Sequence, residues 1–158
     1  MRYAKEELHY PVWGISPSST PDDSGGYEAY GVTGLVWPYA AKKGLSQCYE
    51  CQGPDQESVV TPHASFIALD VLPQQGYDNI QTLRTLYPDI YGPNGFYDAV
   101  NPTTHKVGHR ILVLDQSMIM AALDNALENR AMQRHFAKDP VSWAAQTYLS
   151  MERMSIAP

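Results

Sequence analysis

The feature that most constrains the fold is a row of apolar residues with helical spacing in the second half of the chain. Thr61 and Pro62 are residue types that begin helices, and Pro73 is of a type that ends them. Between them apolar residues recur three or four positions apart, the spacing of one helix face: Ala64, Ile67, Ala68, Val71 and Leu72. We therefore predict a helix over 61–72.

Further segments of the chain show apolar residues with the same helical spacing. The spacing predicts helices over 75–87, 115–135 and 139–151, and a short helix over 1–9. The last long helix is expected to start at Asp139-Pro140, with the aspartate as its cap. The first half of 115–135 is apolar almost all round, which predicts a buried inner helix. The short link at Pro73 predicts that the first two long helices pair antiparallel. No segment alternates as strands do, so we expect an all-α fold.

Two long segments without a helical period, 11–58 and 89–110, separate these helices. Both are rich in glycine, proline and aromatic residues, and loops of this length inside a compact domain are often functional. The aromatic rings could pin the loops onto the helices, or they could stack on sugar rings. The candidates for sugar binding are Trp13, Tyr27, Tyr30, Phe96 and Tyr97.

The composition of the chain limits the classes of partner that it could bind. The chain has 158 residues, enough for one domain, and a formal net charge of −6. With no basic cluster to neutralise phosphates, neither a nucleic acid nor membrane insertion is expected. Cys48 and Cys51 lack the second ligand pair of a structural zinc site, and a loop disulfide and two free thiols both remain open. We expect no metal and no cofactor.

Five segments, in this order, resemble the glycoamylase-like domain family, whose relatives include endo-β-1,2-glucanases. They are PVWGISPSSTPDDSGGYEAYGV (11–32), VVTPHASFIALD (59–70), YGPNGFYDAVNPTTHKV (91–107), LVLDQSMIMAALDNAL (112–127) and YLSMERMSIAP (148–158). The resemblance implies that residues 1–158 are the C-terminal portion of one (α/α)₆ toroid. It also implies a glucan substrate, an extracytoplasmic location, and an acid partner in an N-terminal portion outside these residues. Ser117 departs from the glycine expected after the Asp-Gln pair.

The candidate chemistry centres on Asp115, where an apolar segment meets a predicted helix start. Glycoside hydrolysis needs two carboxylates, and Asp115 is the candidate catalytic one, which would activate water while the acid partner comes from outside these residues. Helix capping explains the same residue type, and a capping role would keep the carboxylate ionised. Arg110 could pair with Asp115 or Asp98 and lower the pKa of that carboxyl.

The remaining candidates are polar residues near Asp115. Gln116 and Asp98 are candidates for sugar binding, and so is Asn101, which a turn before Pro102 explains equally well. His63 is interpreted as a satisfied core or capping residue.

The resemblance implies a glycoside hydrolase acting on a glucan, with β-1,2-glucan the most natural substrate, and these residues are the candidates for its site. The alternative is a non-catalytic carbohydrate-binding protein or degenerate toroid fragment.

Overall fold

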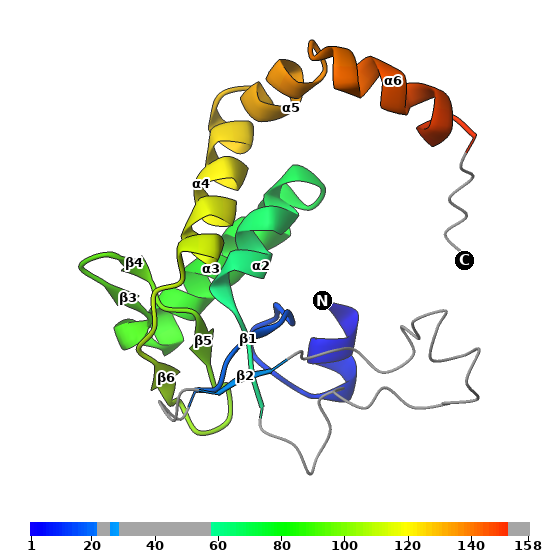
Figure 1. Cartoon of the computed structure of the whole chain (residues 1–158). Helices are drawn as coiled ribbons and strands as arrows, with labels where there is room; N and C mark the ends of the chain where they lie inside the picture. Colours follow the sequence, from blue (N-terminus) through cyan, green and yellow to red (C-terminus); the bar gives the residue numbers. More distant parts are fainter. Residues whose placement is uncertain (22–25, 29–57, 152–158) are drawn as a thin grey trace.

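The computed structural model describes residues 1–21, 26–28 and 58–151, and within them the chain is mostly helical (Figure 1). The helices are η1 (Tyr3–Glu7), α2 (Pro62–Ile67), η2 (Ala68–Asp70), α3 (Pro73–Leu86), η3 (Pro88–Ile90), α4 (Val113–Leu127), α5 (Ala131–Phe136) and α6 (Pro140–Leu149). The expected helical character is therefore confirmed in these ranges. Asp139 caps α6, as its Asp-Pro start predicts, and accepts a 2.8 Å hydrogen bond from the backbone N–H of Val141.

The predicted pairing of the first two long helices is confirmed, and α2 and α3 form a helical hairpin joined through η2. Gly76 lets the two helices approach closely, because a Cβ atom there would lie 2.9 Å from the carbonyl oxygen of Ser65. Pro73 is the first residue of α3 rather than the end of the preceding helix. Proline suits this position, since the first helical N–H has no partner within the helix.

A buried asparagine ties the hairpin to the N-terminal segment. The side chain of Asn79 in α3 accepts a hydrogen bond from the backbone N–H of Trp13 at 3.1 Å. Its amide nitrogen donates to the carbonyl oxygen of Trp13 and to Oγ of Ser65, both at 2.7 Å. Trp13 itself lies in the hydrophobic core, together with Phe66, Leu83 and other residues. Segment 11–21 is thus held against the helices by satisfied polar groups as well as by apolar packing.

The structure adds short strands that the sequence did not indicate. Three two-stranded antiparallel pairs join β1 (Ser18–Ser19) to β2 (Tyr27–Glu28), β3 (Tyr91–Gly92) to β4 (Gly95–Phe96), and β5 (Ala99–Val100) to β6 (Val107–Gly108). Each strand has two residues, too few to show an alternating pattern. They shape the loops that lie over one end of α2 and α4 (Figure 1).

The prediction of one continuous helix over 115–135 is wrong. The chain breaks between α4 and α5, where Asn129 and Arg130 adopt left-handed backbone conformations with φ of 52° and 60°. Helix continuation is impossible at such angles. Apolar side chains are exposed on both sides of this break, among them Leu127 and Met132.

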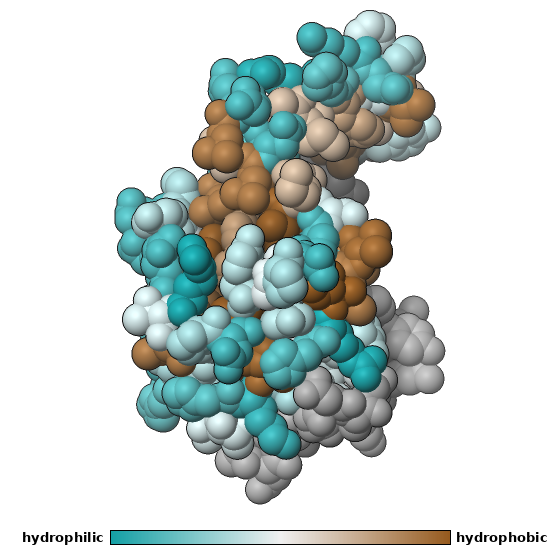
Figure 2. Space-filling model, turned by 90° about the vertical axis from the view of Figure 1, so that its left-hand side faces the viewer, coloured by the Kyte–Doolittle hydropathy of each residue, from teal (hydrophilic) through white to brown (hydrophobic). Residues whose placement is uncertain are grey.

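The prediction that this region is a buried inner helix is also wrong for most of α4. Only Asp115 and Ile119 are buried in it. Large apolar side chains are exposed along α4 to α6, among them Leu114, Met120, Leu127, Met132, Phe136, Val141, Trp143, Tyr148 and Leu149. Figure 2 shows this apolar surface gathered over the upper part of the molecule. Within the described residues no element packs against it, which explains why an apolar sequence forms an exposed helix here.

Candidate functional site

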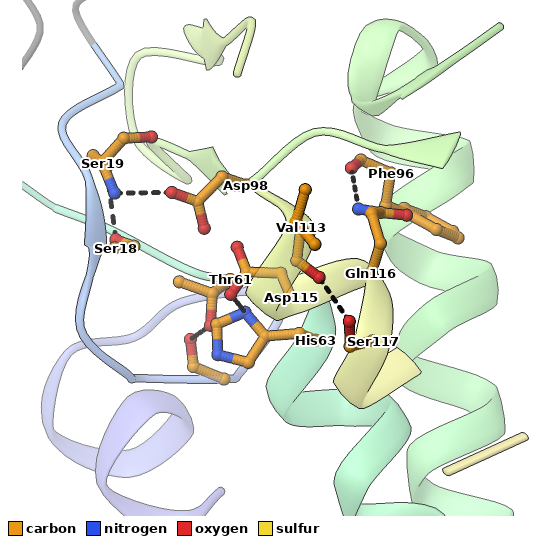
Figure 3. Close-up of polar contacts among 11 residues, drawn as sticks. Ser18, Ser19, Thr61, His63, Phe96, Asp98, Val113, Asp115, Gln116 and Ser117 are labelled. Carbon is orange, nitrogen blue, oxygen red and sulfur yellow. Dashed lines mark hydrogen bonds and ion pairs between the residues drawn. The ribbon is translucent and has the colours of Figure 1, made fainter. Parts of the chain in front are cut away.

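Three buried side chains from separate parts of the chain meet at one end of α2 and α4 (Figure 3). His63 lies in the first turn of α2, Asp98 lies between β4 and β5, and Asp115 lies in the first turn of α4. Their exposed fractions are 2%, 2% and 3%. One nitrogen or oxygen atom of each lies within 4.8 Å of the others. We define these three residues as the carboxylate cluster.

Hydrogen bonds hold Asp98 in place, and Asp115 and His63 contact one another. Oδ2 of Asp98 accepts a 2.6 Å hydrogen bond from the backbone N–H of Ser19, and its own backbone N–H donates to the carbonyl oxygen of Arg110 at 2.9 Å. Oδ1 of Asp115 lies 3.5 Å from Nδ1 of His63. The cluster therefore connects β1, α2, α4 and the segment before β5.

Asp115 does not cap its helix, contrary to the capping interpretation. Helix α4 begins at Val113, and the capping position belongs to Leu112, which makes no side-chain capping bond. Asp115 is the third residue of α4 and so lies within its first turn, and its side chain points toward the other members of the cluster (Figure 3). The carboxyl group is free to interact with Asp98 and His63 instead of the helix end.

The electrostatics also differ from expectation. Burial, a side-chain hydrogen bond with Asp98 and repulsion from the Asp98 charge raise the pKa of Asp115 to about 8. The expected lowering by Arg110 is wrong, because among the described residues the salt bridges join neither carboxylate to a lysine or arginine. Burial lowers the pKa of His63, with the nearby Asp98 opposing that shift. At neutral pH Asp115 thus keeps its proton and His63 is uncharged.

Tyr27 is an exposed aromatic residue on whose hydroxyl the charges of the carboxylate cluster act. It lies in β2, paired with β1, and its side chain is 52% exposed. Burial and the charges of Asp115 and Asp98 raise the pKa of its hydroxyl. The structure therefore brings together three of the predicted site residues, Tyr27, Asp98 and Asp115.

A hydrogen bond joins Gln116 to Phe96. The side-chain nitrogen of Gln116 donates a 2.9 Å hydrogen bond to the backbone carbonyl of Phe96 in β4. Gly95, next to it, has a φ of 114°, and a Cβ atom there would collide with the side chain of Gln116. Gln116 thus holds the β3–β4 turn beside α4, a role that accounts for its side-chain nitrogen without a sugar.

The other predicted sugar-binding residues lie away from the cluster contacts. Trp13 and Phe96 are buried in the core, where Phe96 packs edge-on against Phe66 with ring centres 5.2 Å apart. The half-buried ring of Tyr97 packs against His109. The side-chain oxygen of Asn101 accepts from the backbone N–H groups of Thr103 and Thr104, which is the turn role considered from the sequence. Tyr30, Cys48 and Cys51 lie outside the described residues.

His63 is the site residue that sequence reasoning missed. Its interpretation as a core histidine is right about burial, but it overlooked the contact with Asp115. These residues are 52 positions apart, and no local pattern indicates that they meet. The cluster has the atom types for a divalent cation, since imidazole nitrogen and carboxylate oxygen are common ligands. A shared proton explains the same geometry.

None of the described helices combines the length and apolar character that crossing a membrane requires. No protein of curated function matches the chain in sequence. The structure is similar to that of a putative glucoamylase from Bacteroides caccae, with a TM-score of 0.67 and 21% identity over 92% of this chain and 31% of that one. It is also similar to a putative glucoamylase from Bacteroides fragilis, with a TM-score of 0.64 and 22% identity over 87% and 28% of the two chains.

A third similar structure is the endo-β-1,2-glucanase from Chitinophaga pinensis in complex with sophorotriose and glucose. The TM-score is 0.63 and the identity 19%, over 87% of this chain and 29% of that one. At these identities the likeness shows the fold alone, and the chain spans about a third of the length of these proteins. The sequence profile of the glycoamylase family, described as putative glucoamylase, matches residues 2–140. The chain therefore belongs to the glycoamylase family.

Proposed function

We propose that this chain forms part of a glycoside hydrolase that acts on a glucan, with Asp115 as a catalytic carboxylate. Membership of the glycoamylase family supports the reaction class. The similar fold of an endo-β-1,2-glucanase makes β-1,2-linked glucan the first substrate to test. The observation that carries the proposal is the raised pKa of Asp115, about 8, because a glycosidase needs one carboxyl group that stays protonated at neutral pH.

In this reaction the Asp115 hydroxyl donates its proton to the glycosidic oxygen, and the bond between that oxygen and the anomeric carbon breaks. Water supplies the new hydroxyl on the sugar, and its proton passes to a second carboxylate. Glycosidase carboxylates lie about 5–5.5 Å or about 6.5–9.5 Å apart. Asp98 lies closer than this to Asp115 and already binds Ser19, so it does not fit the second role.

The second carboxylate, which accepts the proton of water, is proposed to come from the N-terminal portion of the domain. This reverses the roles expected from the sequence, where that portion was to supply the acid, because the pKa of Asp115 is raised and not lowered. The similar solved proteins are about three times as long as the matched region, which leaves room for such a portion. We also propose that the helices complete an (α/α)₆ toroid and that the exposed apolar surface of α4 to α6 packs against the other helices. An extracytoplasmic location remains part of this proposal, and cell fractionation tests it.

One observation favours the second candidate function, carbohydrate binding without hydrolysis. Asp115 is 3% exposed, so a glycosidic bond cannot reach its carboxyl group in this conformation. In that case Tyr27, which is exposed beside the cluster, would stack on a sugar while the cluster serves only to hold the loops.

Hydrolysis of a panel of glucans by the complete gene product separates the two functions. We expect reducing ends to appear from β-1,2-glucan, and the Asp115→Asn variant to lower kcat by at least about 100-fold, the lower bound for a lost proton donor. Glu128→Gln is the matched control, because Glu128 is an exposed acid at the other end of α4. Full activity in Asp115→Asn would refute its catalytic role, and binding of gluco-oligosaccharides without any hydrolysis would support the second function.

A further inference from the structure

The carboxylate cluster contains buried polar atoms that have no hydrogen-bond partner as ionised groups. They are Oδ1 of Asp98, Oδ2 of Asp115 and Nδ1 of His63. Buried polar atoms without partners are costly, and each such atom requires an explanation. Figure 3 shows the carboxylates of Asp98 and Asp115 pointing toward one another. Two ionised carboxylates cannot satisfy each other, because both only accept hydrogen bonds.

We propose that Asp98 and Asp115 share one proton, which pairs their otherwise unpartnered oxygens, and that Asp98 is the positioning residue that keeps this proton on Asp115. The inference deepens the proposed function, on which its catalytic meaning rests. The proton-sharing itself is a property of the folded chain and can be measured without activity.

The charge of the cluster supports this arrangement. Two carboxylates buried within 4.8 Å of one another would carry two negative charges away from water. Repulsion and desolvation both oppose that state, and one proton between the groups relieves them. The groups that act on this carboxyl from the surrounding described elements are Asp98, His63 in α2 and Tyr27 in β2. None of them is a permanent cation.

The hydrogen bonds also determine which carboxylate keeps the proton. The backbone N–H of Ser19 donates to Oδ2 of Asp98 at 2.6 Å, and such a bond stabilises the ionised form. Asp115 has no comparable donor among the described backbone groups. The negative charge therefore rests on Asp98 and the proton on Asp115. Nδ1 of His63 lies 3.5 Å from the other oxygen of Asp115.

The test is a ¹³C NMR titration of the aspartate side-chain carboxyl carbons in the intact chain between pH 3 and pH 10. In the wild-type chain we expect one carboxyl of the pair to lose its proton only near pH 8. In Asp98→Asn, the amide oxygen still accepts from Ser19 but carries no charge. The late titration of Asp115 should then move down by about one pH unit or more.

Asp89→Asn is the matched control, since Asp89 is exposed and lies nine residues from Asp98. It should leave the titration of Asp115 unchanged. The proposal is overturned if neither wild-type carboxyl keeps its proton to near pH 8, or if Asp98→Asn leaves the late step in place. Hydrolysis plays no part in this readout, so its failure and the failure of the proposed function are distinguishable.

Discussion

Nδ1 of His63 lies 3.5 Å from Oδ1 of Asp115, and this contact joins the first turn of α2 to the first turn of α4. Both side chains are almost fully buried. The contact places an uncharged imidazole beside a protonated carboxyl group, because burial lowers the pKa of His63 and raises that of Asp115. The two shifts have opposite effects on how stability depends on pH.

The first prediction concerns that dependence. The pKa of Asp115 is raised from 3.8 to about 8, so the folded chain holds this proton more tightly than the unfolded chain. The resulting stabilisation is complete below pH 4 and is lost as the pH rises to about 8. The pKa of His63 is lowered from 6.5, so its penalty on folding grows only as the pH falls below that value.

Toward the upper end of the range between pH 6.5 and 8, therefore, the contribution of Asp115 exceeds that of His63. Urea unfolding should show the free energy of unfolding of the wild-type chain falling with pH in this window relative to that of Asp115→Asn. The comparison cancels groups common to both chains, such as the N-terminal amine, whose pKa is lowered. Parallel curves for the two chains would show that Asp115 has an ordinary pKa.

The second prediction compares two neighbours in α4. Ile119 is 7% exposed and packs in the core, whereas Met120 is 67% exposed. Ile119→Ala should lower the free energy of unfolding by about 2–5 kcal/mol, because it removes buried methyl groups and leaves a cavity. Met120→Ala should change it by less than about 0.5 kcal/mol. Similar losses for both variants, measured by urea unfolding, would mean that the Met120 face of α4 is also covered.

A third prediction concerns Asn79, which makes three buried hydrogen bonds to Trp13 and Ser65. Asn79→Ala should lower the free energy of unfolding by about 1–3 kcal/mol, since it leaves buried backbone groups of Trp13 unsatisfied. Gln81→Ala, on the exposed side of α3, is the control and should have little effect. Equal thermal midpoints for the two variants would contradict the role of Asn79 in fixing segment 11–21.

The fold was predictable where local chemistry determines it. The Thr-Pro start of α2, the Asp-Pro start of α6 and the apolar spacing of α3 are signals within a few residues, and the structure confirms them. The break at Asn129 and Arg130 was not predictable from spacing, because the apolar pattern runs through it. The burial of α4 could not be inferred either, since it depends on which other elements are present to cover an apolar helix.

The site was only partly predictable for a similar reason. Asp115, Asp98 and Tyr27 stand out as polar or aromatic residues in informative positions, and the structure brings them together. His63 and Ser19 contribute through contacts over long sequence separations, 52 residues to Asp115 and 79 to Asp98 respectively. Gln116 was a candidate sugar ligand because the sequence does not indicate that its side chain binds the carbonyl oxygen of Phe96. That hydrogen bond joins residues 20 positions apart and exists only in the folded chain.

A fourth prediction is the decisive one, the pH dependence of kcat/KM for glucan hydrolysis by the complete gene product. If Asp115 donates the proton, activity on β-1,2-glucan should fall as the pH rises through about 8, the pKa of its buried carboxyl. Asp98→Asn should move this fall to lower pH, while Glu128→Gln should leave it in place. Activity that stays constant or rises through pH 8, or a fall that Asp98→Asn does not move, would contradict the assignment of Asp115 as the proton donor.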